Sequence, residues 1–126
     1  MALTATSYTI QTAFTDIHKA LLQAKLSHYV TKSYAAHEAF GKTYDAINEL
    51  IDSITEKLIG YSDTDPGNLV IGTIAPMECR TFALYLIGIA ERLEEFALKN
   101  KYPDISNLAQ ELGGVGAQLK YLCRFK

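Results

Sequence analysis

Apolar residues recur at three- and four-residue steps in four separate segments of this 126-residue chain. Such spacing places a stripe of side chains on one face of an α-helix. The longest unbroken stripe lies at about residues 34–59 and consists of His37, Phe40, Tyr44, Ile47, Ile51, Ile54 and Leu58. Gly60 follows it, in the position of a glycine that ends a helix. Each stripe has to be buried against the others, so the sequence predicts a helical bundle.

The other three helices are expected at about residues 7–31, 78–100 and 104–124. Short connections join the first helix to the second and the third to the fourth, whereas the second and third are joined by a long one that contains Pro66-Gly67. The apolar residues 69–76 of this connection have no second strand to pair with, so we expect a crossover packed on the helices. The predicted fold class is all-α, a ferritin-like four-helix bundle with a long crossover between helices 2 and 3, as a single domain over residues 1–126.

Three glycines, Gly113, Gly114 and Gly116, interrupt the stripe of the fourth helix. Each costs roughly 1 kcal/mol of helix stability relative to alanine. We therefore expect that the helix bends there or that another backbone approaches it closely.

Composition and charge argue against several classes of protein. Hydrophobic residues make up 48% of the chain and charged residues 21%, which is typical of a globular domain. No apolar run approaches the ~20 residues of a membrane span, and the N-terminal residues do not resemble a signal peptide, so we expect a cytoplasmic protein. The net charge of −2 and the scarcity of basic clusters argue against binding to nucleic acid.

The two cysteines, Cys79 and Cys123, have 43 residues between them. They form neither a CxxC pair nor the spacing of a disulfide framework. We therefore expect two free thiols.

Two histidines and two carboxylates form the candidate site. His28 and His37 stand nine residues apart around a short break between two predicted helices, each in phase with an apolar stripe. Asp52 and Glu56 lie at i, i+4 spacing on the second helix, where two like charges favour a cation opposite them. Imidazole and carboxylate ligands together suit iron, zinc or manganese.

Helix geometry decides how these residues could act together. The 15 residues from His37 to Asp52 span ~22 Å along a helix, so one ion cannot contact both within one chain. In an antiparallel pair of second helices, the histidine end of one chain would lie beside the carboxylates of the other. A two-fold axis would then generate two such sites in a dimer.

Residues 28–60, HYVTKSYAAHEAFGKTYDAINELIDSITEKLIG, resemble the corresponding region of the Dps family of ferritin-like proteins. His28 and His37 match the two histidines of that family, and Asp52 and Glu56 match its paired carboxylates. The resemblance implies an iron site between subunits that oxidises Fe(II), in a two-fold dimer that builds a larger shell. The sequence is also similar to an uncharacterised group of small, phage-encoded helical proteins, which would place it in the host cytoplasm.

The match is not complete. Gly41 occupies a position at which Dps proteins usually carry an acidic ligand, and the N-terminus lacks the lysine-rich tail through which they bind DNA. The resemblance therefore implies a metal-binding oligomer and does not extend to DNA binding.

Other interpretations stay open from the residues alone. The histidines could be hydrogen-bonded to carboxylates or backbone, or could form a pH-dependent interface, and Asp52 and Glu56 could form a solvated helix flank. His18 lies off the apolar stripe and is expected at the surface. An alternative function is that of a metal-free phage accessory protein that sequesters a small host molecule or binds a host protein. A second alternative is a structural component of a virion.

Overall fold

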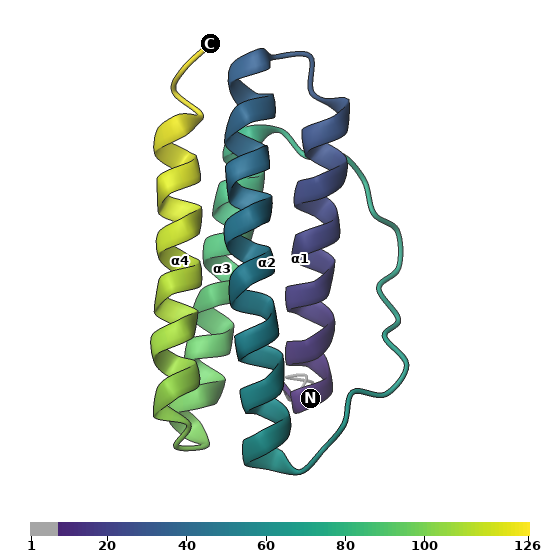
Figure 1. Cartoon of the computed structure of the whole chain (residues 1–126), viewed down its shortest axis with the longest axis vertical. Helices are drawn as coiled ribbons and strands as arrows, with labels where there is room; N and C mark the ends of the chain where they lie inside the picture. Colours follow the sequence, from purple (N-terminus) through teal and green to yellow (C-terminus); the bar gives the residue numbers. More distant parts are fainter. Residues whose placement is uncertain (1–7) are drawn as a thin grey trace, which may run out of the picture.

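The computed structural model describes residues 8–126, which form four α-helices and no strand. The helices are α1 (Ile10–Val30), α2 (Tyr34–Ser62), α3 (Cys79–Lys99) and α4 (Pro103–Leu122). They pack side by side as a bundle with their axes nearly aligned (Figure 1). The prediction of an all-α four-helix bundle is confirmed.

Three of the four helices begin at a side chain that accepts a hydrogen bond from the first turn. Thr9 caps α1 and Ser33 caps α2, whereas the Glu78 carboxylate accepts from two N–H groups at the start of α3. Pro103 opens α4, where a missing N–H carries no cost. These polar residues fix the starts of the helices close to where the sequence placed them.

The predicted end of α2 at Gly60 is wrong, because the helix continues to Ser62. Its cap is Asp63, which adopts the left-handed conformation with φ of 54° and donates its N–H to the carbonyl of Ile59. An aspartate tolerates this conformation better than most residues. A Cβ at Gly60 would meet nothing within 4 Å, so nothing in the bundle demands a glycine there.

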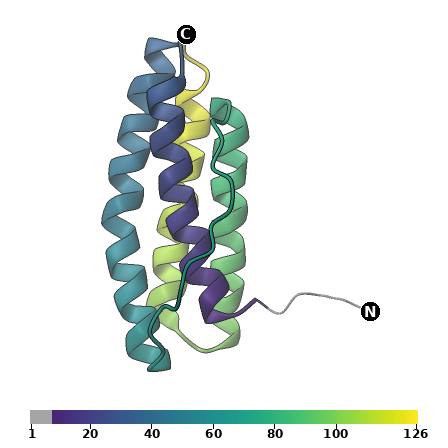
Figure 2. The ribbon, with the colours of Figure 1, turned by 90° about the vertical axis from the view of Figure 1, so that its right-hand side faces the viewer.

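The crossover between α2 and α3 runs the length of the bundle beside α1 (Figures 1 and 2). The backbone of the crossover does not pair with a strand or continue a helix. Side chains of α1 form hydrogen bonds with several of its N–H and carbonyl groups instead. Gln11 bonds to Gly67 and Asn68, Gln23 accepts from the N–H of Ala75, and Ser27 accepts from the N–H of Met77. The crossover carries the chain back across the bundle, so α2 and α3 run parallel.

The core is built from the four apolar stripes that the periodicity predicted. Its largest fully buried side chains come from all four helices: Phe14, Phe40, Phe82, Ile17, Ile47, Ile54, Leu58, Leu86, Ile89, Leu93, Ile105 and Leu112. The outer faces of the helices carry the charged residues, together with exposed apolar side chains such as Leu22, Leu84 and Leu98. Within residues 8–126 we find no helix with both the length and the apolar character that crossing a bilayer requires.

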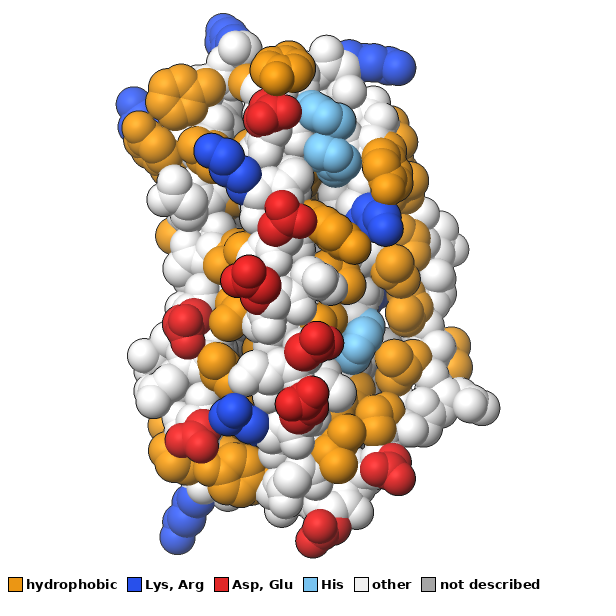
Figure 3. Space-filling model, in the orientation of Figure 1, with side chains coloured by type: hydrophobic (Ala, Val, Ile, Leu, Met, Phe, Trp, Pro, Cys, Tyr) orange, Lys and Arg blue, Asp and Glu red, His pale blue; other side chains and the backbone are white. Residues whose placement is uncertain are grey.

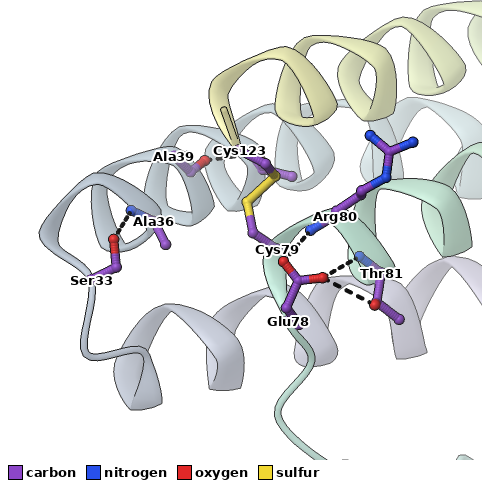
Figure 4. Close-up of a disulfide and its surroundings, with 9 residues drawn as sticks. Ser33, Ala36, Ala39, Glu78, Cys79, Arg80, Thr81 and Cys123 are labelled. Atoms are coloured by element: carbon purple, nitrogen blue, oxygen red, sulfur yellow. Dashed lines mark hydrogen bonds between the residues drawn. A yellow bond between two sulfur atoms is a disulfide. The ribbon is translucent and has the colours of Figure 1, made fainter. Parts of the chain in front are cut away.

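The expectation of two free thiols is wrong, because Cys79 and Cys123 form a disulfide (Figure 4). The helices α3 and α4 are antiparallel neighbours, so the first residue of α3 lies beside the residue that follows α4, with 5.7 Å between the two Cα atoms. A separation of 44 positions in sequence conceals this proximity.

The close packing of α3 on α4 explains one of the three glycines of α4. A Cβ at Gly116 would lie 2.8 Å from Cγ1 of Ile87 and 3.2 Å from the backbone oxygen of Ala83. Gly116 is therefore the point at which a second backbone approaches closely, one of the two explanations expected from the sequence. A Cβ at Gly113 would make only an ordinary contact, and one at Gly114 would meet nothing within 4 Å.

Substitution of these glycines by alanine should change stability in opposite directions. Gly114→Ala should raise the free energy of unfolding by about 1 kcal/mol, because alanine favours the helix and has open space. Gly116→Ala should lower it, because overpacking costs roughly 1–3 kcal/mol and the backbone of α3 cannot move aside. Urea unfolding measures both values. A Gly116→Ala variant as stable as Gly114→Ala would contradict the close approach of the two helices.

Candidate functional site

The two candidate histidines lie together at one end of the bundle, where α1 ends and α2 begins. His28 belongs to the last turn of α1 and His37 to the first turns of α2, and both side chains are partly buried. Figure 3 shows histidine side chains beside a column of carboxylates on the face that α2 presents. The short turn between the helices, Thr31–Ser33, holds the two residues side by side.

Two reciprocal hydrogen bonds join the histidines. Nδ1 of His37 lies 2.9 Å from the carbonyl oxygen of His28, and Nδ1 of His28 lies 2.7 Å from the carbonyl oxygen of His37. The carbonyl of His28 belongs to the last turn of α1, which has no further helical N–H to bond with. His37 therefore caps α1, and the pair fastens the two helix ends together.

These bonds fix the tautomer of both rings. A carbonyl oxygen can only accept, so each Nδ1 must carry the proton and donate it. In a neutral imidazole the other nitrogen, Nε2, is then left with a lone pair. Histidines that bind metals are commonly held by this kind of outer hydrogen bond, which orients the ring and makes the free nitrogen a better ligand.

The rings also stack, with 3.9 Å between their centroids and 18° between their planes. An ion bound to an imidazole lies in the plane of the ring, about 2.0–2.1 Å from the nitrogen. Two nearly parallel rings at this spacing cannot both point a lone pair at one ion. The stack therefore suits two separate ions, one for each ring, and not a single ion chelated by both.

Gly41 provides the space for the His28 ring. A Cβ at this position would lie 3.1 Å from Cε1 of His28 and 3.4 Å from its Nδ1. Gly41 is the residue that stands where the Dps family usually carries an acidic ligand. The structure offers a local explanation for a glycine at this position. A larger residue would press against the His28 ring, which is already hydrogen-bonded and stacked.

A hollow of about 360 Å³ opens beside His28 between α1 and α2, lined by Lys25, His28, Tyr29, Gly41, Tyr44 and Asp45. The ammonium group of Lys25 lies 5.2 Å from the centroid of the Tyr44 ring. Hydrogen bonding to Tyr44, followed by the influence of Tyr29, raises the pKa of Lys25 above its ordinary value. The hollow therefore contains a carboxylate that the sequence interpretation did not count among the ligands, Asp45, and a lysine that stays charged.

Asp52 and Glu56 lie elsewhere on α2, toward its other end. Both are exposed, and they belong to a row of exposed charged side chains on the outer face of α2: Glu38, Lys42, Asp45, Glu49, Asp52 and Glu56. In the part of the chain that the structure describes, no three His, Cys, Asp or Glu residues come close enough together to hold an ion. One chain thus brings the two histidines together and keeps the two carboxylates apart from them.

The third histidine shares one property of the pair. Nδ1 of His18 lies 2.7 Å from the carbonyl oxygen of Phe14, one helical turn earlier, so its Nε2 is also left as an acceptor. The side chain is partly buried, so the expectation of a surface residue holds only in part. The sequence does not predict this bond, because every residue inside a helix has a backbone carbonyl four positions earlier.

A second concave region lies between α2 and α4. It has a volume of about 450 Å³ and is lined by Lys42, Thr43, Ala46, Glu49, Leu50, Glu111, Gly114, Val115, Gln118 and Leu122. Its floor is mainly apolar, and its charged residues stand at separate points along it. The missing side chain of Gly114 leaves space that forms part of this groove.

Comparison with known proteins identifies a family but not an activity. Residues 28–123 match the sequence model of one family, described as a family of unknown function (DUF5856). No curated protein and no solved structure matches the chain. The matched region begins at His28 and covers α2, the crossover, α3 and α4.

The fit between His28 and Gly41 can be measured by a double-mutant cycle. In the wild-type background, Gly41→Ala should lower the free energy of unfolding, because the new methyl group presses on the fixed ring. In a His28→Ala background the same change should raise it by about 1 kcal/mol, the helix preference of alanine over glycine. Urea unfolding of the four proteins gives the coupling energy, expected to be at least about 1 kcal/mol.

Gly60→Ala is the matched control for this cycle. A Cβ at Gly60 would meet nothing within 4 Å, so the effect of the substitution should be the same with and without His28. If Gly41→Ala stabilised the wild-type protein as much as Gly60→Ala does, the His28 ring would not occupy the space above Gly41.

Proposed function

The chain belongs to the DUF5856 family, whose function is not known, and we propose that it is a homo-oligomeric protein that binds divalent transition-metal ions, iron first among them, at sites shared between two subunits. In this proposal His28 and His37 of one subunit supply nitrogen ligands, and Asp52 and Glu56 of the other supply oxygen ligands. The observation that carries it is the reciprocal Nδ1–carbonyl bonding of the two histidines, which leaves both Nε2 atoms free to bind an ion.

The spacing of the rings supports a pair of ions. The two nearly parallel rings cannot chelate one ion together, so we assign one ion to each ring. Asp45, which lines the hollow together with His28, is a candidate for an oxygen ligand from the same chain.

The charges of α2 favour one register for an antiparallel dimer. Lys42 and Glu49 are both exposed and both line the groove between α2 and α4. If Lys42 of each subunit faces Glu49 of the other, opposite residues have numbers that add up to 91. His37 then faces the level of the partner's Ile54, with Asp52 and Glu56 of the partner about 3 Å away along the helix axis on either side.

The excess of negative charge on this face of α2 favours a cation between the two subunits. Glu38, Asp45, Glu49, Asp52 and Glu56 are all exposed on the outer face of α2, against Lys42 as the one basic residue in that row. Two such faces packed together would place carboxylates near carboxylates, which is unfavourable. Divalent ions bound between the subunits would offset this repulsion, so we expect metal and dimer to form together.

Oxidation of Fe(II) by oxygen or peroxide, and assembly into a larger shell, enter the proposal only through the resemblance to the Dps family. The glycine at position 41 removes one of the acidic ligands usual in that family. We therefore propose metal binding as the function and a ferroxidase reaction as its extension. The cytoplasm is the compartment that we propose, on the sequence features already described.

A second candidate function is the capture of a small molecule, and the groove between α2 and α4 favours it. A volume of about 450 Å³ with a mainly apolar floor is within the range of small-ligand sites. Glu49 and Glu111 on its lining would suit a ligand that carries a positive group. This function needs neither a metal nor the histidines, so chelators and His37→Ala would leave it unchanged.

The primary proposal predicts metal uptake that depends on two distant residues. After anaerobic loading with Fe(II) and removal of free ion, mass spectrometry should find one or two ions per chain. His37→Ala and Asp52→Ala should each reduce uptake at least about tenfold, because a lost ligand typically removes most of the affinity of a site. Glu91→Ala, on an exposed position of α3, is the control and should bind as the wild type does.

Mixing the two variants tests whether the site is shared. A heterodimer of His37→Ala and Asp52→Ala chains contains one site with both ligands intact and one with neither. Uptake should therefore recover to about half of the wild-type value in heterodimers, as two-fold symmetry requires. No recovery on mixing would contradict a site between subunits, and no uptake by the wild type would contradict metal binding altogether.

The proposed register predicts that a positive charge added to this acidic face at position 49 weakens dimerisation. Glu49→Lys makes the acidic face less negative, so net charge alone would strengthen dimerisation. The proposed pairing predicts weaker dimerisation, by about fivefold or more, because two lysine pairs would replace two ion pairs. Sedimentation in the presence of divalent metal measures the dissociation constant.

Adding Lys42→Glu to Glu49→Lys should restore association, since the opposite charges again face each other. Glu95→Lys, on an exposed position of α3, should have little effect. A Glu49→Lys protein that associates more tightly than the wild type would refute this register.

A further inference from the structure

The disulfide closes the α3–α4 pair at the end opposite the turn that connects the two helices. It joins Cys79, the first residue of α3, to Cys123, the residue directly after α4 (Figure 4). His28 and His37 lie at this same end of the bundle, but neither histidine lines the hollow at the disulfide. The bond is therefore a separate chemical feature of the molecule.

The two cysteines differ in exposure. Cys79 has a relative exposure of 9% and belongs to the core, whereas Cys123 is only partly buried. A hollow of about 400 Å³ adjoins the bond, and its lining includes both cysteines, Met77 from the crossover and Phe125 from the C-terminal segment. A small molecule that enters this hollow meets Cys123 as the more accessible of the two residues.

Three basic residues flank the two cysteines along the chain. Arg80 follows Cys79, and Arg124 and Lys126 follow Cys123; all three are exposed. Glu78, the one charged residue among the described residues that line the hollow, is engaged by the N–H groups of Arg80 and Thr81, which hold its pKa below the ordinary value. These three basic residues, here called the cationic rim, attract thiols that carry negative charge toward the cysteines.

We propose that Cys123 is a site of reversible thiol–disulfide exchange with a small acidic thiol of the glutathione class. The thiolate of the small molecule attacks Sγ of Cys123, a new bond forms between these two sulfurs, and the bond between Cys123 and Cys79 breaks. Cys79 leaves with the electron pair as a thiolate and takes a proton from water. A second small-molecule thiolate then attacks the sulfur of the bound one; the bond to Cys123 breaks, Cys123 leaves as a thiolate, and the two small molecules depart joined by a disulfide.

The position of Cys79 suits it to the role of leaving group. It is the first residue of α3, where the helix dipole favours negative charge on a sulfur. In a reducing compartment such as the cytoplasm, thiols are abundant and disulfides exchange with them. The greater exposure of Cys123 and its basic neighbours thus favour attack at its sulfur. The position of Cys79 at the start of a helix favours its sulfur as the leaving group.

Opening the bond would release the end of the chain. Beyond Cys123, the backbone is held by two turn bonds, from Arg124 N–H to the carbonyl of Tyr121 and from Phe125 N–H to that of Leu122. Phe125 is exposed and forms one wall of the hollow. Exchange at Cys123 would therefore loosen residues 123–126 and widen access to the hollow.

Peptide mapping of the oxidised full chain tests the site of attack. The protein is incubated with reduced glutathione under native conditions, quenched with acid and an alkylating reagent, and analysed by mass spectrometry. We expect glutathione on Cys123 and the alkyl group on Cys79. An adduct mainly on Cys79, or a bond that opens only after denaturation, would overturn the proposal.

Single-cysteine variants keep the test independent of how long the mixed disulfide survives. The free Cys123 of a Cys79→Ser protein should react with oxidised glutathione at least tenfold faster than the free Cys79 of a Cys123→Ser protein. Circular dichroism confirms that both variants remain helical. If a variant does not fold, the comparison is made in the wild type by the initial ratio of the two adducts, and equal labelling would refute selective attack.

The preference for an acidic thiol has its own test. Arg124→Gln should slow the reaction with glutathione about threefold and leave the reaction with neutral 2-mercaptoethanol unchanged. Lys99→Gln, at the far end of α3, should change neither rate. Equal rates of the wild type and Arg124→Gln with glutathione would refute the role of the cationic rim.

Discussion

The structure depends on the need to bury four apolar stripes in one core. Each helix has one face that water disfavours, and the four faces can be buried together only if the helices pack side by side. This fixes which residues point outward. On α2, burial of Phe40, Ile47, Ile54 and Leu58 turns the charged row from Glu38 to Glu56 toward solvent. The proposed metal-binding face is therefore a consequence of how the core is packed.

The helix ends show a second requirement, the satisfaction of backbone groups that a helix leaves free. At the end of α1 this role falls to His37, and the same bond sets the tautomer of its ring. A structural role and a ligand role are thus compatible in one side chain, because they use different nitrogens. The interpretation of these histidines as bonded to backbone, which the sequence left open, describes Nδ1, and the proposed metal binding concerns Nε2.

The sequence predicted the fold better than the site. The four helices and the crossover followed from periodicity and turn residues, because those signals are local. The errors concerned contacts between distant residues: the disulfide, which depends on α3 and α4 being antiparallel, and the end of α2, which Asp63 provides in place of Gly60. The role of Gly41 was equally hidden, since the ring that needs its space comes from another helix.

By itself the sequence determined the number of helices, their polar and apolar faces and the spacing of His28, His37, Asp52 and Glu56, because all of these are periodic properties of a single segment. Only the tertiary structure decided that the two rings stack with their Nδ1 atoms bonded to backbone, that Gly116 admits a second helix and that Cys79 meets Cys123. These features join residues of different helices, and their distances are set by packing, which no pattern along the chain encodes.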